Sequence, residues 1–168
     1  MGKPLVAVVM GSESDMPVMG ETTKVLEQFK VEYKLIVASA HRSPRLVQEF
    51  ARGAENTGLE VIIAGAGGAA HLPGVIAAET VLPVIGVPID SSSMKGLDSL
   101  LSIVQMPGGV PVATMAIGPA GARNAGIFAV QILSKKNPSL LIQLRQYKDE
   151  MAEAIEKKNK KSEVRNQK

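Results

Sequence analysis

The stretch YKLIVASAHRSP, Tyr33–Pro44, joins an apolar run to the start of a helix. Its first half is rich in bulky and β-branched residues and is predicted to be a buried strand. Ser43 followed by Pro44 is the pair preferred at a helix N-cap and first helical position. The loop between them, with His41 and Arg42, is therefore expected at the carboxyl end of a strand. In open parallel sheets, ligands bind at that edge.

The same strand, loop and helix pattern recurs along the chain. Apolar runs predict strands over 5–10, 33–37, 61–64, 84–87 and 110–117. Helices are predicted from Pro17, over 44–56, 75–79, 97–104 and 122–133, and from Pro138 to about Lys157. Parallel neighbours need crossovers of this length. The sequence therefore predicts a three-layer α/β/α fold, with a flavodoxin-like parallel sheet in the order 2-1-3-4-5 and a C-terminal helix.

One domain is expected over residues 1–157, including the last helix, with a basic, frayed tail at 158–168.

The spacing of apolar residues predicts which faces of the helices are covered. The stripe on the last helix is expected to dock on the core or on a neighbouring subunit. That stripe comprises Leu140, Leu144, Tyr147, Met151 and Ile155, and the buried face of helix 44–56 comprises Leu46, Val47, Phe50, Ala51 and Ala54.

Charge and composition exclude several classes. The net charge of +3 arises from 19 Lys and Arg against 16 Asp and Glu. Residues 1–144 are balanced and the excess lies in the tail, so nucleic-acid binding is not expected. Cysteine is absent, which excludes disulfides and thiolate chemistry. The first apolar run is too short for a signal or membrane span, so we expect a cytoplasmic protein that does not contact membranes.

A polar loop, Gly11–Asp15, follows the first strand. Two serine hydroxyls, backbone N–H groups and a helix N-terminus suit a phosphate, and Asp15 suits the hydroxyls of a ribose. The alternative is an ordinary capping loop with Ser14 or Asp15 at the N-cap. The candidate binding residues are Gly11, Ser12, Ser14 and Asp15.

The second loop contributes Ser39, Ala40, His41 and Arg42. A guanidinium offers forked donors to phosphate oxygens, and an imidazole is suited to moving protons near neutral pH. A lone histidine in a loop is more often a surface or capping residue than a catalyst, so the loop alone favours that explanation of His41. Arg42 could alternatively pair with a surface carboxylate.

The third loop, Gly65–Gly74, is almost entirely glycine and alanine, which leaves its backbone bare beside a ligand. Close packing of a helix on a strand is the alternative explanation. It is neither a Walker loop nor a dinucleotide fingerprint, since no Gly-Lys-Ser/Thr follows and the glycine spacing differs. Because adjacent strand ends place His71 near His41, a shared site is expected. The candidates are Gly67, Gly68, Ala69, His71 and Leu72.

These three loops together resemble the signature loops of the N5-carboxyaminoimidazole ribonucleotide (N5-CAIR) mutase family, the class I enzymes of purine biosynthesis. SLLSIVQMP at 99–107 and GVPV at 109–112 also match, so the resemblance covers about residues 4–135. The departures are small: Met16 and Ser43 stand where tryptophan and threonine are common.

The resemblance implies an isomerase that moves a carboxyl group from N5 to C4 without ATP, metal or organic cofactor. His41 would be the general acid and base, and His71 and the glycine loop would confine carbon dioxide and the base. The family also forms octamers with sites shared between subunits. The 5′-phosphate would be held by Ser12, Ser14, Ser39 and Arg42, and the ribose by Asp15.

Three alternatives stay open at this point. The class II relatives carboxylate aminoimidazole ribonucleotide directly with carbon dioxide, but carry lysine after the histidine and Ser-Asn in the glycine loop. This chain has Arg42 and Gly67–Ala70 there, which favours the mutase. The second alternative is a non-catalytic module that binds a phosphate, nucleotide or flavin. Only 3% of residues are aromatic, which argues against stacking on a flavin. A metalloenzyme that uses His41 and His71 is the third.

Overall fold

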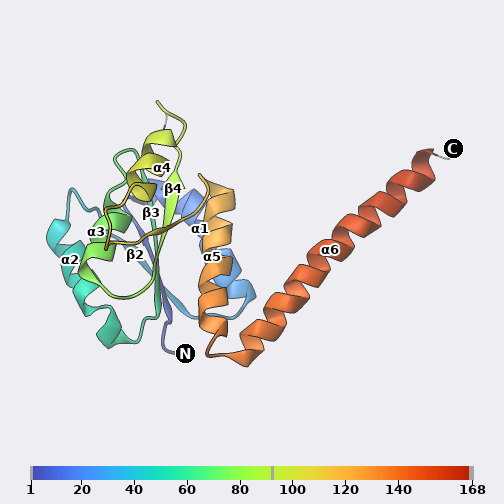
Figure 1. Cartoon of the computed structure of the whole chain (residues 1–168), viewed down its shortest axis with the longest axis horizontal. Helices are drawn as coiled ribbons and strands as arrows, with labels where there is room; N and C mark the ends of the chain where they lie inside the picture. The colour runs from blue at the N-terminus through green and yellow to red at the C-terminus, as the bar shows by residue number, and fades with distance from the viewer. Residues whose placement is uncertain (1, 92, 167–168) are drawn as a thin grey trace.

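The computed structural model describes residues 2–91 and 93–166, with side chains up to residue 159. Its centre is a parallel sheet in the order β2-β1-β3-β4-β5, as predicted (Figure 1). Residues 6–10 have no exposed surface, because the central strand is covered on both faces. The strands are β1 (Val6–Met10), β2 (Tyr33–Val37), β3 (Val61–Gly67), β4 (Val84–Ile89) and β5 (Ala113–Thr114).

Helices cover both faces of the sheet. Helices α1, α5 and the start of α6 pack on one face, and α2, α3 and α4 pack on the other. The side chains of β1 alternate between the two cores, with Val8 in the first and Val9 in the second. The helices are α1 (Met16–Gln28), α2 (Pro44–Gly53), α3 (Leu72–Glu79), α4 (Leu97–Val104), α5 (Pro119–Ser134) and α6 (Pro138–Asn166), with 3-10 turns at Glu13–Asp15 and Glu55–Thr57.

Strand β2 is not the buried strand that its apolar run predicts. It pairs with β1 at the edge of the sheet, and Leu35 and Val37 are 40% and 42% exposed. An apolar run without alternation does not distinguish a central strand from an edge strand. Leu46 is likewise 48% exposed, because the buried face of α2 is narrower than predicted and centres on Val47 and Ala51.

Strand β5 is also much shorter than the predicted 110–117. Pro111 has no N–H to donate to a ladder, and Gly109 before it has a left-handed φ of 97°. Regular pairing therefore starts only at Ala113. Strand β3, by contrast, continues three residues past its predicted end to Gly67, so the start of the glycine-rich segment is strand.

Helix α6 has two parts with different surroundings. Leu140 and Leu144 are buried, and the Tyr147 ring lies edge-on to Phe29, with 5.7 Å between ring centroids. Met151 and Ile155 are 46% and 57% exposed, on the part of the helix that projects from the domain (Figure 1). The helix runs to Asn166, beyond its predicted end near Lys157. Among the described residues, no helix has the length and apolarity needed to cross a membrane.

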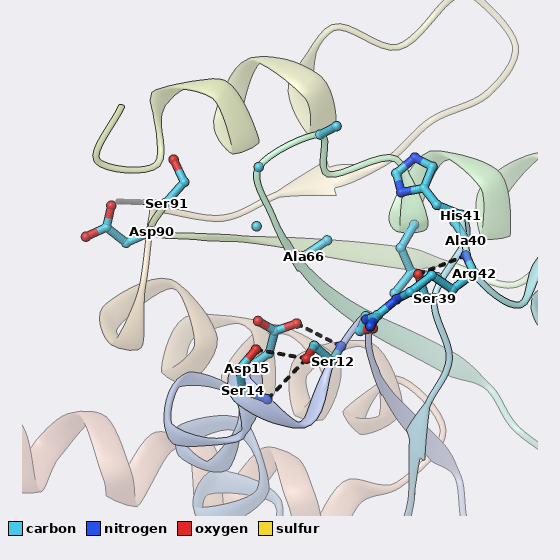
Figure 2. Close-up of a pocket in the computed structure, with 15 residues that line it drawn as sticks. Ser12, Ser14, Asp15, Ser39, Ala40, His41, Arg42, Ala66, Asp90 and Ser91 are labelled. Carbon is cyan, nitrogen blue, oxygen red and sulfur yellow. Dashed lines mark hydrogen bonds between the residues drawn. The ribbon is translucent and has the colours of Figure 1, made fainter. Parts of the chain in front are cut away.

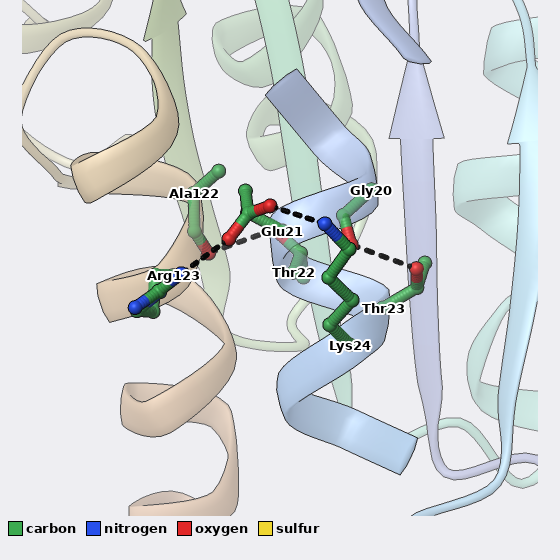
Figure 3. A network of polar contacts seen from close by, with 7 residues as sticks. All are labelled: Gly20, Glu21, Thr22, Thr23, Lys24, Ala122 and Arg123. Atoms are coloured by element: carbon green, nitrogen blue, oxygen red, sulfur yellow. Dashed lines mark hydrogen bonds and ion pairs between the residues drawn. The ribbon is translucent and has the colours of Figure 1, made fainter. Parts of the chain in front are cut away.

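Polar contacts join α1 to α5 (Figure 3). Glu21 accepts from Lys24 and from Arg123, both at 2.6 Å, and the buried Thr22 hydroxyl donates to the Ala122 carbonyl at 2.8 Å. The hydrogen bond from Arg123, and then that from Lys24, lowers the pKa of Glu21 to about 2. The ionised carboxylate therefore stabilises the packing of these helices.

Replacing Glu21 with Gln is expected to lower the melting temperature modestly, by roughly 1–3 °C at pH 7. Because the folded pKa is depressed, the stabilisation is complete above the unfolded pKa and disappears as the pH falls from about 4.5 towards 2. Melting curves between pH 7 and 2.5 check this, with the exposed Glu49→Gln on α2 as control. A difference between E21Q and the parent protein that is independent of pH would contradict it.

Candidate active site

The carboxyl ends of β1 to β4 open into one pocket of about 590 Å³. Figure 2 shows its lining side chains converging from four loops. His71 is not one of the lining residues, but its ring contacts that of His41. Every predicted binding residue lines the pocket together with His41, namely Gly11, Ser12, Ser14, Asp15, Ser39, Ala40, Arg42, Gly67, Gly68, Ala69 and Leu72.

The loop after β1 is held by a capping box. The Ser12 hydroxyl accepts from the Ser14 N–H at 3.4 Å and from the Ser14 hydroxyl at 2.9 Å, and Asp15 Oδ2 accepts from the Ser12 N–H at 3.1 Å. Asp15 thus stands at the N-cap of α1 without capping that helix. Because the Ser12 oxygen is the acceptor in both of its bonds, its own hydrogen is available to a ligand.

The loop after β2 supplies further donors. Arg42 Nη2 donates to the Gly11 carbonyl at 3.0 Å rather than to a surface carboxylate, which ties the first two loops together. The Ser39 hydroxyl accepts from the Arg42 N–H at 3.2 Å, so its hydrogen also stays available. Guanidinium N–H groups beyond the one used remain to bind an anion. This end of the pocket is therefore rich in donors.

The two histidines form a hydrogen-bonded pair. His41 Nε2 and His71 Nδ1 are 2.9 Å apart, and their rings meet edge to face at 4.9 Å between centroids. One nitrogen must carry the proton and the other must accept it, so each ring sets the tautomer of the other. Both residues are exposed, and His41 is the one that lines the pocket. Within the described residues, no three His, Asp or Glu side chains gather as a metal-binding group.

The glycine-rich loop has both a structural and a ligand-facing part. A Cβ on Gly65 would overlap the Met19 sulfur, so this glycine permits the close approach of α1 to β3. Gly68 instead has a left-handed φ of 60° and open space where its Cβ would lie. Together with Gly67 and Ala69, it presents bare backbone to the pocket. Both explanations of this loop therefore apply, to different residues.

The sequence analysis missed three lining residues, Ala66, Asp90 and Ser91. Ala66 lies in the part of β3 that was predicted to be loop. Asp90 and Ser91 follow β4, and the sequence analysis selected no candidate residues in that loop. The strand-end rule that selected the other loops applies equally to β4 and would have identified them.

Burial raises the pKa of the Asp15 carboxyl, although N–H groups of Ser12 and Gly11 and the charge of Arg42 lower it in part. A raised folded pKa means that the ionised carboxylate opposes folding at neutral pH, and that this cost is absent where the carboxyl is protonated. Side chains kept at such a cost are typical of functional sites.

Replacing Asp15 with Asn is therefore expected to maintain or raise the melting temperature at pH 7.5, by roughly 1–3 °C at most, because the group is only partly buried. The amide oxygen still accepts from the Ser12 N–H. The gain should shrink as the pH falls and the wild-type carboxyl protonates. Thermal melts at pH 7.5 and 4 check this against Asp149→Asn on α6. A clear loss of stability at pH 7.5 would show that the charge is structural.

Comparisons with known proteins agree on one family. Residues 5–154 match the family described as AIR carboxylase. A Pyrococcus horikoshii protein named N5-carboxyaminoimidazole ribonucleotide mutase is 56% identical over 161 residues, covering 96% of this chain and 90% of that protein. The Thermotoga maritima protein of the same name is 52% identical, covering 96% and 94%. A crystal structure of Treponema denticola PurE aligns with a TM-score of 0.85 and 26% identity, covering 94% of this chain and 98% of that one.

Proposed function

The chain belongs to the AIR carboxylase family, and from this we infer that it catalyses the mutase reaction of purine biosynthesis. It converts N5-CAIR to 4-carboxy-5-aminoimidazole ribonucleotide (CAIR) by moving the carboxyl group from N5 to C4. The observation that carries this inference is 52–59% identity to proteins named as that mutase, over nearly the whole chain.

We propose that the donor-rich end of the pocket binds the 5′-phosphate. Arg42 provides a fixed cation, and the hydroxyls of Ser12, Ser14 and Ser39 surround it. Charge-assisted bonds of this kind are the strong ones, and they fix the position of the substrate. Asp15, beside the serines, would accept from a ribose hydroxyl.

His41 is proposed as the general acid and base. As the N5–carbon bond breaks and carbon dioxide leaves, the imidazolium protonates N5, which gives the 5-amino group. C4 then attacks the carbon dioxide, and the neutral imidazole removes the C4 proton, which restores both the aromatic ring and the charged catalyst. One proton is given and one taken, so a single imidazole suffices. His71 would hold the His41 ring in position through their shared hydrogen bond.

Carbon dioxide must stay in the pocket between these two steps. The part of the lining formed by Gly67, Gly68, Ala69 and the buried Leu72 carries no charged or polar side chain, and we propose that carbon dioxide is held there. Excluding water from the pocket also prevents the hydration of this carbon dioxide to bicarbonate.

We also propose that the protein acts in the cytoplasm as a homo-octamer. The support is the exposed apolar surface on three elements: β2 at Leu35 and Val37, α4 at Leu97 and Leu101, and the projecting part of α6. No partner other than the small ribonucleotide and further copies of the chain is proposed.

An assay without ATP or added metal tests the function. N5-CAIR is supplied in one reaction, and aminoimidazole ribonucleotide with bicarbonate in the other, while CAIR is followed in the ultraviolet. Rapid product from the first and slow product from the second at modest bicarbonate is expected. The opposite preference would identify a direct carboxylase, and turnover of neither would leave a phosphate-binding module.

A further inference from the structure

The pocket wall formed by Asp90 and Ser91 differs chemically from the rest of the site. These residues follow β4, whereas Arg42 and His41 follow β2, three strand spacings away, or about 14 Å. Figure 2 shows the two pairs on opposite sides of the pocket. An anion bound at Asp90 would be repelled by its carboxylate, so the phosphate does not belong at this end.

Hydrogen bonding makes Ser91 an acceptor towards the pocket. Its hydroxyl lies 2.8 Å from both carboxylate oxygens of Asp98, in the first turn of α4, and donates its only hydrogen to that carboxylate. This bond is the main reason that the pKa of Asp98 lies below its usual value. With its hydrogen committed, the Ser91 oxygen offers only lone pairs to a ligand.

The backbone on which Ser91 stands is also fixed by α4. The buried Ser99 hydroxyl donates to the Ile89 carbonyl at 2.8 Å, at the end of β4. Asp98 accepts from the Ser99 N–H at 2.9 Å, so the carboxylate is itself held in place. The end of β4, Ser91 and the first turn of α4 therefore form one connected unit.

We propose that the Ser91 oxygen accepts a hydrogen bond from the ribose 2′-hydroxyl of the ribonucleotide. Asp98 is a positioning residue in this proposal: it takes the Ser91 hydrogen, so that the Ser91 oxygen can only accept. This proposal rests on the function inferred above. With the 5′-phosphate at the Arg42 end, the 2′-carbon is farther from the phosphate along the sugar than the 3′-carbon is. In this proposal the hydroxyl at C2′ donates to the Ser91 oxygen at the β4 end of the lining, and the 3′-hydroxyl is left to Asp15.

The test uses ribose 5-phosphate and 2-deoxyribose 5-phosphate, which differ only in that hydroxyl. Their dissociation constants are measured by calorimetry, and their inhibition constants are measured against N5-CAIR. The parent protein is expected to prefer the ribose compound by about 5- to 10-fold. Ser91→Ala should weaken the binding of ribose 5-phosphate by that factor and leave the binding of 2-deoxyribose 5-phosphate unchanged.

The Asp98 variants test the positioning role. Asp98→Ala should lower the same preference, because the Ser91 hydroxyl is then free to rotate but can still accept. The double variant should lose no more than Ser91→Ala alone, because Asp98 acts only through Ser91. Asp98→Asn keeps an oxygen that accepts from Ser91 and should retain much of the preference. Ser102→Ala is the matched control: its hydroxyl donates to the Asp98 carbonyl at 2.7 Å on the same helix, away from the pocket lining.

Three results would overturn the proposal while the function stands. The first two are equally weakened binding of both sugars by Ser91→Ala and additive losses in the double variant. Normal turnover of N5-CAIR by the parent protein, with no preference between the sugars, would do the same. A parent protein that neither turns over N5-CAIR nor binds either sugar phosphate would refute the inferred function, and the Ser91 assignment with it.

Discussion

His41→Asn is expected to lower kcat by at least 10²-fold and by up to about 10⁴-fold. Asparagine has a similar size and polarity but cannot give or take a proton, so both halves of the carboxyl transfer lose their catalyst. The side chain is exposed, and the substitution should leave the melting temperature nearly unchanged. Steady-state rates of CAIR formation, with circular dichroism to verify folding, check the prediction.

The comparison with His71→Asn sharpens this test. If His71 only positions the imidazole through their 2.9 Å contact, its loss should cost less than the loss of His41. A His41→Asn protein that is folded and turns over within tenfold of the parent would contradict the assignment. A greater loss in His71→Asn than in His41→Asn would exchange the two roles.

Arg42→Met is expected to raise KM by roughly 10- to 100-fold, since charged hydrogen bonds to phosphate are worth about 1.5–3 kcal/mol. The effect on kcat should be smaller, because the phosphate does not react. Arg42→Lys keeps the charge but loses the forked geometry, so an intermediate KM is expected. Initial rates over a range of N5-CAIR concentrations measure both parameters.

Arg45→Met provides a matched control. Arg45 is exposed on α2, three residues from Arg42, and does not line the pocket. Replacing Arg45 should leave the KM for N5-CAIR unchanged. Adding inorganic phosphate should likewise leave the KM of Arg42→Met unchanged, because that variant has lost its phosphate site. An unaltered KM in Arg42→Met would show that the serine hydroxyls hold the phosphate without the guanidinium.

The strand order and most helices were predictable, because continuous apolar runs and glycine or proline boundaries encode them locally. The helix α4 begins and ends at its predicted residues, Leu97 and Val104. Exposure was not predictable in the same way. The apolar side chains of β2 look like those of a central strand, and only the pairing of the whole sheet makes β2 an edge. The length of β5 was overestimated because the prediction ignored that Pro111 has no N–H to donate to a neighbouring strand.

The convergence of the three loops was predictable from topology. Parallel strands bring their carboxyl ends to one edge, and the order 2-1-3 makes His41 and His71 neighbours of the first loop. The hydrogen-bond directions within the site were not predictable. That Ser12 keeps its hydrogen while Ser91 gives its own away depends on side-chain placement, which no spacing pattern encodes.

The most direct test of carboxyl transfer within one pocket follows the carboxyl carbon. N5-CAIR labelled with ¹³C in its carboxylate is converted in a large excess of unlabelled bicarbonate, and the CAIR formed is analysed by mass spectrometry within one turnover time. The pocket proposed here retains carbon dioxide between the two steps, so CAIR should keep the label. Product that carries mostly unlabelled carboxylate would show that the carbon exchanges with solution, and would contradict transfer within the site.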